Sequence, residues 1–346
     1  GWETVINSKR ARDFFSKWLA AYGDDSIAQM AGAHVFFENI SMVATKVLED
    51  FRVGLAPLEK STRYVLFNEK PGGRYLYLAE KNILSSEFGR AYTKNMNMLF
   101  DNYSNSIVPL IKYLKKIFPQ EKDQSERAYN NTMLAKACDV LRSYLPASTL
   151  TNVGFFGVGQ AFEYMLTKCF ASPLWEIRSL AKLAQEELNK IIPSLVDRAS
   201  SPRGKVYQKY VKDTEKGLEK LTKSILGDMS MVSDGITADL VEWDDDAENK
   251  IVASLLYKYS TLPYSSIKER VSNLDFKKKE EVIKKAVGMR GVRQHKLVRA
   301  FENTYYKFDI VANLGIYRDL HRHRMLTQER QRFTTELGID VPSDLV

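Results

Sequence analysis

Along most of the chain, apolar residues recur every three or four positions, with polar residues in the spaces between them. This spacing places the apolar side chains on one face of an amphipathic helix. Helices are therefore predicted over residues 1–22, 27–51, 81–145, 174–198, 205–226, 247–260 and 308–316. A polar stretch at 119–124 predicts a loop that interrupts the third of these.

Two other stretches indicate strands. Residues 64–67 and 74–78 are rich in aromatic residues and flank a Pro-Gly-Gly sequence, which is typical of a hairpin. Residues 235–243 form a short strand-like run. The glycines of residues 154–160 (GFFGVGQ) indicate a turn and not a dinucleotide-binding loop, because no strand pattern leads into them. The combination of predicted helices and strands indicates an α+β fold, in which long helices pack with antiparallel sheets.

The composition is that of a globular protein. The chain has 346 residues, of which 44% are hydrophobic and 27% charged, and this length is enough for two domains. No apolar run approaches the roughly 20 residues of a membrane span, and the amino terminus does not resemble a signal peptide. Cys138 and Cys169 form neither a disulfide framework nor a zinc-binding pattern. We expect two buried thiols in a cytoplasmic protein without a membrane partner.

The net charge of +8 favours anionic partners: nucleotides, phosphorylated cofactors or nucleic acid. Lysine runs such as 277–279 are expected to be the solvated face of a helix, so nucleic acid is the less favoured partner. Asp244-Asp245-Asp246 precedes a predicted helix, where acidic residues are more often caps than metal ligands. We therefore predict no metal site.

A dense cationic cluster lies at residues 317–324 (YRDLHRHR), where five of eight residues are arginine or histidine. It follows the predicted helix at 308–316, and positive residues near the carboxyl end of a helix are ordinary capping. The consecutive side chains of Arg322, His323 and Arg324 point in several directions, which also suits a polyanion held from more than one side. The charge pattern alone is compatible with both interpretations.

The chain contains a weak internal repeat. When Gln29 is placed on Glu302 and the alignment runs on without gaps, residues 49–51 (Glu-Asp-Phe) fall on residues 322–324 (Arg-His-Arg). The best linker is the polar stretch at 199–204. We accordingly predict two related domains, residues 1–203 and residues 204–346.

These motifs resemble the signature of the flavin-dependent thymidylate synthase family, which consists of Arg-His-Arg, a short spacer, Ser, and a following Arg-Tyr. Residues 322–324, with Glu302 upstream and residues 327–329 (Thr-Gln-Glu) downstream, are similar to its first part. Residues 61–64 (Ser-Thr-Arg-Tyr) of the first repeat are similar to its end. Residues 139–146 (DVLRSYLP) resemble another family segment, and Lys168 lies where the family has a substrate-binding arginine.

The resemblance implies reductive methylation of dUMP to dTMP, with methylenetetrahydrofolate as the one-carbon donor and FAD reduced by NADPH. Catalytic roles are implied for Ser61, Arg322 and Arg324. FAD contacts are implied for Glu302, Arg322, His323, Arg324 and Thr327. Contacts with dUMP are implied for Ser61, Arg63, Asp139, Arg142, Lys168 and Glu329. No protein nucleophile is required, in agreement with the two cysteines.

Neither repeat carries the complete signature, because the first lacks Arg-His-Arg and the second lacks the serine. We therefore expect sites assembled across the domains or between subunits, in a homo-oligomer such as a dimer of tandem chains. The second repeat stops at Val346, well before the length of the first, so we expect a longer protein with a further carboxy-terminal part. The alternative is a duplicated fold that has lost catalysis and binds nucleotide or RNA through its basic surface.

Overall fold

The computed structural model describes residues 28–227 and 235–338, together with Arg10, Asp13 and Lys17. Apart from those three residues, the predicted helix at 1–22 lies outside the described residues. The chain divides into two compact units, one made of residues 1–232 and 313–346 and the other of residues 233–312. These units do not coincide with the repeats at 1–203 and 204–346, and the relationship between the two repeats stays a prediction.

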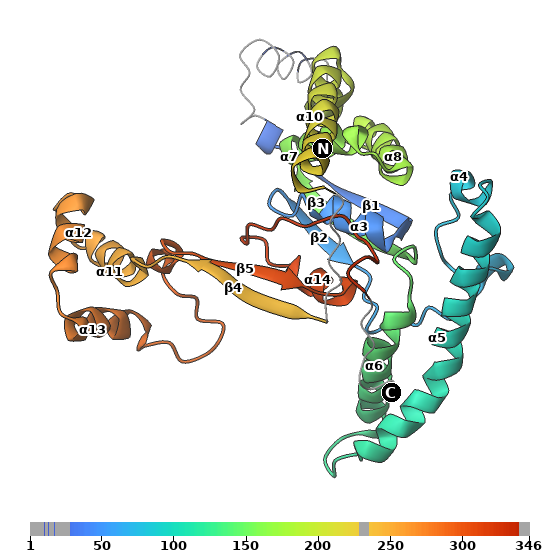
Figure 1. The fold of residues 1–346 in the computed structure, drawn as a ribbon, viewed down its shortest axis with the longest axis horizontal. Coiled ribbons are helices and arrows are strands. Elements are labelled where there is room, and N and C mark those ends of the chain that lie inside the picture. Colours follow the sequence, from blue (N-terminus) through green and yellow to red (C-terminus); the bar gives the residue numbers. More distant parts are fainter. Residues whose placement is uncertain (1–9, 11–12, 14–16, 18–27, 228–234, 339–346) are drawn as a thin grey trace. The chain divides into compact units, whose positions relative to one another are not determined.

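A three-stranded antiparallel sheet forms the centre of the first unit (Figure 1). Its strands, in order across the sheet, are β1 (Gly32–Ser41), β3 (Leu150–Val158) and β2 (Leu55–Glu59). Thr151, Val153 and Phe155 of β3 are buried, whereas the residues between them are less so. This alternation turns one face of the sheet toward a core.

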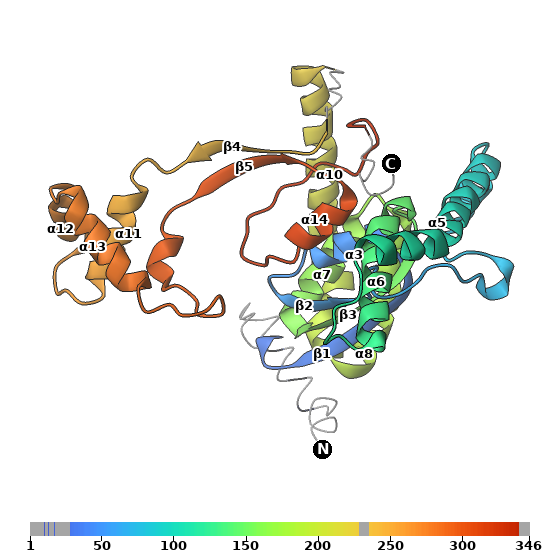
Figure 2. The same cartoon turned by 90° about the horizontal axis from the view of Figure 1, so that it is seen from below.

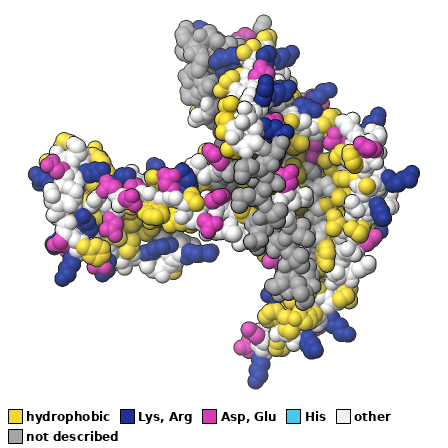
Figure 3. All heavy atoms as spheres, in the orientation of Figure 1, with side chains coloured by type: hydrophobic (Ala, Val, Ile, Leu, Met, Phe, Trp, Pro, Cys, Tyr) yellow, Lys and Arg dark blue, Asp and Glu magenta, His cyan; other side chains and the backbone are white. Residues whose placement is uncertain are grey.

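Helices from the same unit complete this core. They are α3 (Met42–Glu49), α7 (Gly159–Ala171), α8 (Trp175–Ile191) and α9 (Pro193–Val196), and α10 (Pro202–Leu226) packs against α7. Phe37, Phe155, Phe162, Met165 and Ile177 are buried in it, and each such side chain contributes about 1.5–3 kcal/mol to folding. Helix α10 lies mostly outside the core, and its visible face mixes lysines with hydrophobic side chains (Figure 3).

A helical hairpin forms a second core in this unit (Figure 2). Helix α5 (Gly89–Ile117) packs on α6 (Glu126–Leu141), and the short helix α4 (Lys81–Leu84) precedes them. The helices predicted over 81–145 and the loop at 119–124 are confirmed by this hairpin. Short 3₁₀ helices lie at Pro71–Gly73, Arg142–Tyr144 and Asp197–Ser200.

Among its described residues, the second unit has a two-stranded antiparallel ribbon and three α-helices. Strand β4 (Thr237–Trp243) pairs with β5 (Tyr306–Val311). The helices are α11 (Ala247–Tyr257), α12 (Tyr264–Ser272) and α13 (Phe276–Val287), with a 3₁₀ helix at Arg299–Glu302. The core is small and includes Val252 and Ile267.

The helices and small antiparallel sheets confirm the predicted α+β class. The strand predicted at 235–243 is confirmed by β4. Within the described residues, no helix has the length and apolar character needed to cross a bilayer.

The helix predicted over 27–51 is wrong in its first half. Residues 32–41 form β1, and α3 begins only after Ser41, whose Oγ accepts a hydrogen bond from the Ala44 amide at 3.0 Å. A bulge between Phe37 and Ile40 shifts the strand register. Ala33, Phe37 and Ile40 therefore face the core at intervals of four and three residues, an irregular strand pattern that imitates a helix.

The hairpin predicted over 64–78 is also wrong. Residues 71–73 form a 3₁₀ turn, and within this stretch β-pairing is limited to an isolated bridge between Tyr77 and Thr149. Phe67, Tyr75 and Tyr77 are instead buried in the core of the helical hairpin. Their burial among helices overrides their preference for a strand.

Two further predictions differ from the structure, one in the type of element and one in its bounds. Residues 150–158, part of which was interpreted as a turn, form the central strand β3, because its glycines are tolerated where neighbouring side chains approach the backbone. The run at 308–316 continues strand β5 to Val311 and becomes helical only in α14 (Leu314–Leu320).

Candidate functional site

The carboxy-terminal segment of the first unit carries the cationic cluster. Helix α14 starts after Asn313, whose Oδ1 accepts a hydrogen bond from the Ile316 amide at 3.0 Å, and it ends at His321. Arg318 is only 5% exposed and His321 only 1%. A buried charge without a partner is unfavourable, so the contacts of these two residues determine what the helix can do.

Arg318 is held at the end of strand β2. Its Nη2 donates to Oε1 of Glu59 at 2.8 Å, and its Nη1 donates to Oγ1 of Thr62 at 2.9 Å. The Glu59 side chain is itself buried, and its Oε2 accepts from Nζ of Lys46 at 3.0 Å. Lys46 also pairs with Glu49. The two buried carboxylates are thus balanced by buried cations.

His321 lies between two carboxylates of the turn that follows α3. Its Nε2 is 2.9 Å from Oδ1 of Asp50, and its Nδ1 is 3.6 Å from Oε2 of Glu49, which is too long for a hydrogen bond but close enough for charge attraction. Burial would lower the pKa of His321, but Asp50 and Glu49 outweigh it and raise that pKa. Burial would raise the pKa of Glu49, but His321 and Lys46 lower it. The site therefore favours the imidazolium form.

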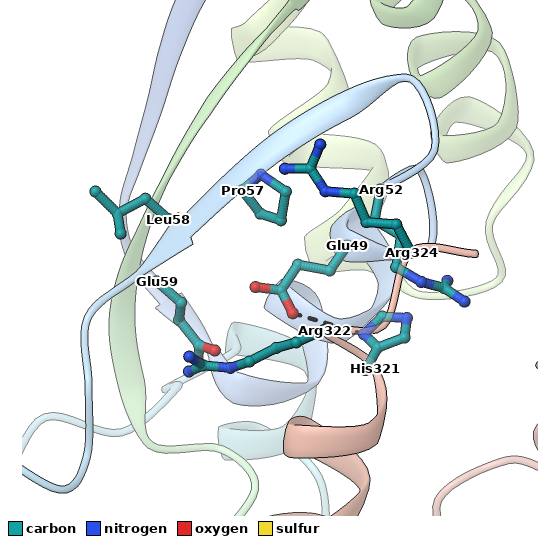
Figure 4. A pocket seen from close by; sticks show the side chains of 8 residues that line it. All are labelled: Glu49, Arg52, Pro57, Leu58, Glu59, His321, Arg322 and Arg324. Carbon is teal, nitrogen blue, oxygen red and sulfur yellow. Dashed lines mark ion pairs between the residues drawn. The ribbon is translucent and has the colours of Figure 1, made fainter. Parts of the chain in front are cut away.

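The three residues after His321 have no such partners. Arg322, His323 and Arg324 are exposed, and no described residue forms a side-chain hydrogen bond or ion pair with them. Arg322 and Arg324 line a cavity of about 200 Å³, together with Arg52 and the paired carboxylates (Figure 4). Since those carboxylates are already balanced, the cavity has a surplus of positive charge.

The predicted serine turn contacts α14. Oγ of Ser61 accepts a hydrogen bond from the Arg63 amide at 3.2 Å. Arg63 donates to Asp139 and to Asp319 of α14, both at 2.9 Å, and Arg142 pairs with Asp139 at 3.1 Å. The structure thus brings Ser61, Arg63, Asp139 and Arg142 together beside the helix that leads to Arg-His-Arg.

Three other predicted residues are not part of this cluster. Glu302 belongs to the second unit, where it pairs with Arg299 at 2.9 Å. Thr327 and Glu329 follow the cationic residues, are exposed, and form no side-chain hydrogen bond with a described residue. The roles of all three stay predictions.

Lys168 lies near a larger cavity, of about 790 Å³, that residues of α7 and α10 line. Its Nζ is 5.7 Å from the ring centre of Tyr164 and 5.5 Å from that of Tyr207, two tyrosines that line this cavity. The contacts are cation–π interactions, and no described carboxylate pairs with Lys168. Its positive charge therefore stays available beside an aromatic surface.

The sequence prediction missed the residues that hold the cationic stretch in place. The Arg52 guanidinium donates to the carbonyl oxygens of Leu326 at 3.1 Å and His323 at 3.4 Å. Asp50 binds Arg330 at 2.7 Å as well as His321. A signal was present in the repeat, where acidic residues 49–50 fall on basic residues 322–323.

Cys138 and Cys169 are free and buried, which confirms the sequence prediction. Burial raises the pKa of Cys169 to about 12, so this thiol is not a nucleophile near neutral pH. In the part of the chain that the structure describes, no group of three or more His, Cys, Asp or Glu side chains is arranged to hold a metal ion. Asp244 and Asp246 pair instead with Lys250 at 2.7 Å and Lys268 at 2.8 Å.

The sequence is similar to known proteins over nearly its whole length. The profile of a family described as thymidylate synthase complementing protein matches residues 3–194. A UPF0159 protein of Chlamydia muridarum is 39% identical over 344 residues, which are 99% of this chain and 65% of that protein. A UPF0159 protein of Chlamydia pneumoniae is 37% identical, with 98% and 64% covered. One from Thermoplasma acidophilum is 32% identical, with 97% and 70% covered. The chain thus spans just under two thirds of the length of the chlamydial relatives.

Solved structures of a UMP/dUMP methylase, PolB from Streptomyces cacaoi, show a weaker likeness. The structure bound with 5-Br UMP is 15% identical, covers 56% of this chain and 83% of that chain, and has a TM-score of 0.37. The structure bound with 5-Br dUMP is 14% identical, covers 56% and 80%, and has a TM-score of 0.38. A TM-score this low does not establish a shared fold.

Proposed function

Because the chain belongs to the thymidylate synthase complementing protein family, we propose that it acts in the flavin-dependent methylation of dUMP to dTMP. The observation that carries the proposal is the contrast within one segment. Arg318 and His321 are buried and paired, whereas residues 322–324 are exposed and have no described side-chain partner. Adjacent cations that the protein does not pair are available to an anionic ligand. The activity is wholly part of this proposal, since the chain spans just under two thirds of its chlamydial relatives.

The residues present fit FAD. Arg322 and Arg324 each offer a planar fork of donors for its pyrophosphate, and no described carboxylate competes for them. His323 between them is the contact we propose for the flavin ring, where its ring N–H would donate a hydrogen bond to the negatively charged reduced flavin. When bound, FAD would take a hydride from NADPH and supply it to reduce the one-carbon unit, once transferred to dUMP, to the methyl group of dTMP, with tetrahydrofolate released. Thr327 is exposed directly after these cations and could add a hydroxyl contact.

For dUMP, we propose two sets of contacts. The cavity near Lys168 has the size of a small-molecule pocket, and its tyrosines offer a stacking surface for a pyrimidine ring. The ammonium group of Lys168 would attract the phosphate as a point charge. The second set is the Ser61 turn with Arg63, Asp139 and Arg142, where the exposed Glu329 would also contribute. A homo-oligomer would bring the two sets together if they face each other between subunits.

In this proposal, Arg63 and Arg142 supply positive charge to the uracil ring of dUMP. Arg63 binds Asp139 and Asp319, so its guanidinium is already engaged. Burial lowers the pKa of Arg142, although the Asp139 carboxylate opposes this shift. An arginine in such surroundings can place positive charge where an enolate develops on uracil.

FAD titration and a dTMP assay test the proposal. The assay supplies dUMP, methylenetetrahydrofolate and NADPH to the purified full chain. We expect Arg322→Ala and Arg324→Ala each to weaken FAD binding by about tenfold, because a hydrogen bond to a charged group contributes about 1.5–3 kcal/mol. Lys278→Ala on α13 removes an exposed positive charge elsewhere and should leave the affinity unchanged. Equal affinity in all variants, with no dTMP formed, would overturn the proposal.

A second candidate function is RNA or nucleotide binding without catalysis. Helix α10 favours it, because exposed Val206, Tyr210 and Leu221 lie among lysines along a helix that is largely outside the core. A protein that retains no FAD but binds RNA with a steep dependence on salt would support this alternative.

A further inference from the structure

Two corresponding turns of the repeat contact each other in the first unit. One follows α3 and contains Asp50 and Arg52; the other follows α14 and contains residues 322–324. Figure 4 shows Arg52 of the first turn beside Arg322 and Arg324 of the second. We propose that Asp50 and Arg52 are positioning residues, which set the conformation of the cationic turn in which residues 322–324 bind their anionic ligand. This inference rests on the proposed function for the identity of that ligand, but not for the positioning itself.

Arg52 fixes the middle of the cationic turn. Its side chain is buried, with 7% of the residue exposed, and donates to the carbonyl oxygens of His323 and Leu326. Carbonyl groups beyond a helix end have no partner within the helix, so an outside donor decides where they point. One planar guanidinium that reaches both carbonyls holds them at a set separation, which a single ammonium group does less well.

Asp50 fixes the two ends of the same stretch. One oxygen is 2.9 Å from Nε2 of His321, before the turn, and the other accepts from Nη2 of Arg330 at 2.7 Å, after it. Gln328 closes the stretch further by donating to the carbonyl oxygen of Leu320 at 2.8 Å. The backbone between residues 320 and 330 is thus tied at several points, while the side chains of residues 322–324 are left without described partners.

On the predicted repeat, residues 49–51 fall on residues 322–324, so Glu49 and Asp50 stand where the second copy has Arg322 and His323. Basic residues at positions 49 and 50 would place like charges beside His321 and Arg330, whereas the two carboxylates attract them.

Charge supports the same assignment. Asp50 is matched by His321 and Arg330, and Glu49 by Lys46 and His321. Arg52 donates to neutral carbonyl groups, so its positive charge is added to those of Arg322 and Arg324 around one cavity. Arg52 would act on the anionic ligand both by shaping the turn and through its charge.

Hydrogen exchange on the full chain tests the positioning without any ligand. We expect the amides of Arg322 and His323, which donate to the carbonyl oxygens of Asp319 and Leu320, to exchange about tenfold faster in Arg52→Gln and in Asp50→Asn than in the wild type. Arg127→Gln, an exposed arginine on α6, is the matched control and should exchange like the wild type. Amides of strand β3 should stay protected in every variant, which separates a loosened turn from a misfolded protein.

FAD affinity is the second readout. We expect about a tenfold loss in Arg52→Gln and in Asp50→Asn, and partial recovery in Arg52→Lys, which restores the charge but not the fork. Unchanged exchange at residues 322 and 323, with wild-type FAD affinity, would overturn the inference. If the wild type binds no FAD, the proposed function fails, while faster exchange in the two variants would still support the positioning role.

Discussion

Arg318 and Arg322 lie four residues apart, on α14 and on the turn that follows it, yet their surroundings are opposite. Arg318 is buried and donates to Glu59 and Thr62, whereas Arg322 is exposed and has no described side-chain partner. The same contrast separates His321, which lies between two carboxylates, from His323, which has none. Arginine and histidine are therefore buried and paired on the helix but exposed and without described side-chain partners on the turn.

The difference shows how a cation can be assigned to structure or to ligand binding. Taking a guanidinium out of water is unfavourable unless a carboxylate and further hydrogen bonds accompany it. Arg318 meets that condition, so its role is to attach α14 to β2 and the serine turn. Arg322 and Arg324 keep their contact with solvent and with a cavity, so their donors stay available. Burial with a partner marks the first role, and exposure beside a cavity marks the second.

Removing a buried cation should have the largest effect. Arg318→Met leaves the buried Glu59 with Lys46 as its remaining ionic partner, and we expect a loss of about 3–5 kcal/mol in the free energy of unfolding. Arg322→Met should change it by less than about 0.5 kcal/mol, as is usual for an exposed residue. Urea denaturation of both variants measures the difference. Similar losses in the free energy of unfolding in the two variants would contradict the assignment of Arg318 to stability and of Arg322 to ligand binding.

His321 should give an intermediate effect that depends on pH. We expect His321→Gln to lower the free energy of unfolding by about 1–3 kcal/mol near neutral pH. The pKa of His321 is raised above its ordinary 6.5, so its contribution is fully present below that pH and is lost as the pH rises through the raised pKa. The pKa of Glu49 is lowered in the folded protein. Its contribution to stability is therefore present above its ordinary pKa of 4.5 and is lost as the pH falls through the lowered value.

Denaturation of wild type and His321→Gln over a pH series checks this sign. The difference in free energy of unfolding between the two proteins should be largest between about pH 4.5 and 6.5, and it should shrink as the pH rises through the raised pKa of His321. Groups around the imidazole contribute too: Tyr317 stacks on it at 5.0 Å, and Lys46 opposes its charge. A gap that widens with rising pH would mean that His321 is buried as the neutral ring.

The network around Arg63 should give the smallest effect on stability. Its side chain is 41% exposed, and its partners Asp139 and Asp319 are 44% and 46% exposed. Solvent and salt screen such pairs, so Arg63→Met should lower the free energy of unfolding by less than about 1 kcal/mol. A loss as large as that of Arg318→Met would show that exposure does not separate these arginines. Unfolding at low and high salt is the measurement, and the small effect should shrink further at high salt.

The sequence alone was sufficient for the helical hairpin and for the family, because both depend on contiguous residues. The spacing of apolar positions between 81 and 145, and the loop between them, predicted α5 and α6. Residues 322–324 and residues 61–64 carried the resemblance. Strand β1 was missed because its bulge gives the apolar residues a helical interval. Aromatic residues near Tyr75 suggested a hairpin because their burial against helices cannot be inferred from local preference.

The sequence named candidate site residues, whose roles stay predictions, but it could not give the contacts between them. The Asp139–Arg142 pair is local, and its spacing of three residues was visible in the sequence. That Arg63 would reach Asp319, or that Arg52 would bind the carbonyl of Leu326, depends on packing between segments more than 250 residues apart. The sequence shows the charges of these residues but not that they lie close together. Only the acidic residues that the repeat places opposite Arg-His-Arg offered a hint.

The ion pair between Glu59 and Arg318 also affects how the protein is made. The carboxylate is synthesised long before the guanidinium, and at the usual pace of translation the interval is on the order of tens of seconds. Until α14 has been made, Lys46 is the cation that Glu59 and Glu49 share. The final docking of α14 is thus a late event between distant segments, of the kind that slows folding. Ribosome-bound chains that end before residue 318 should therefore hold strand β2 less firmly than released ones.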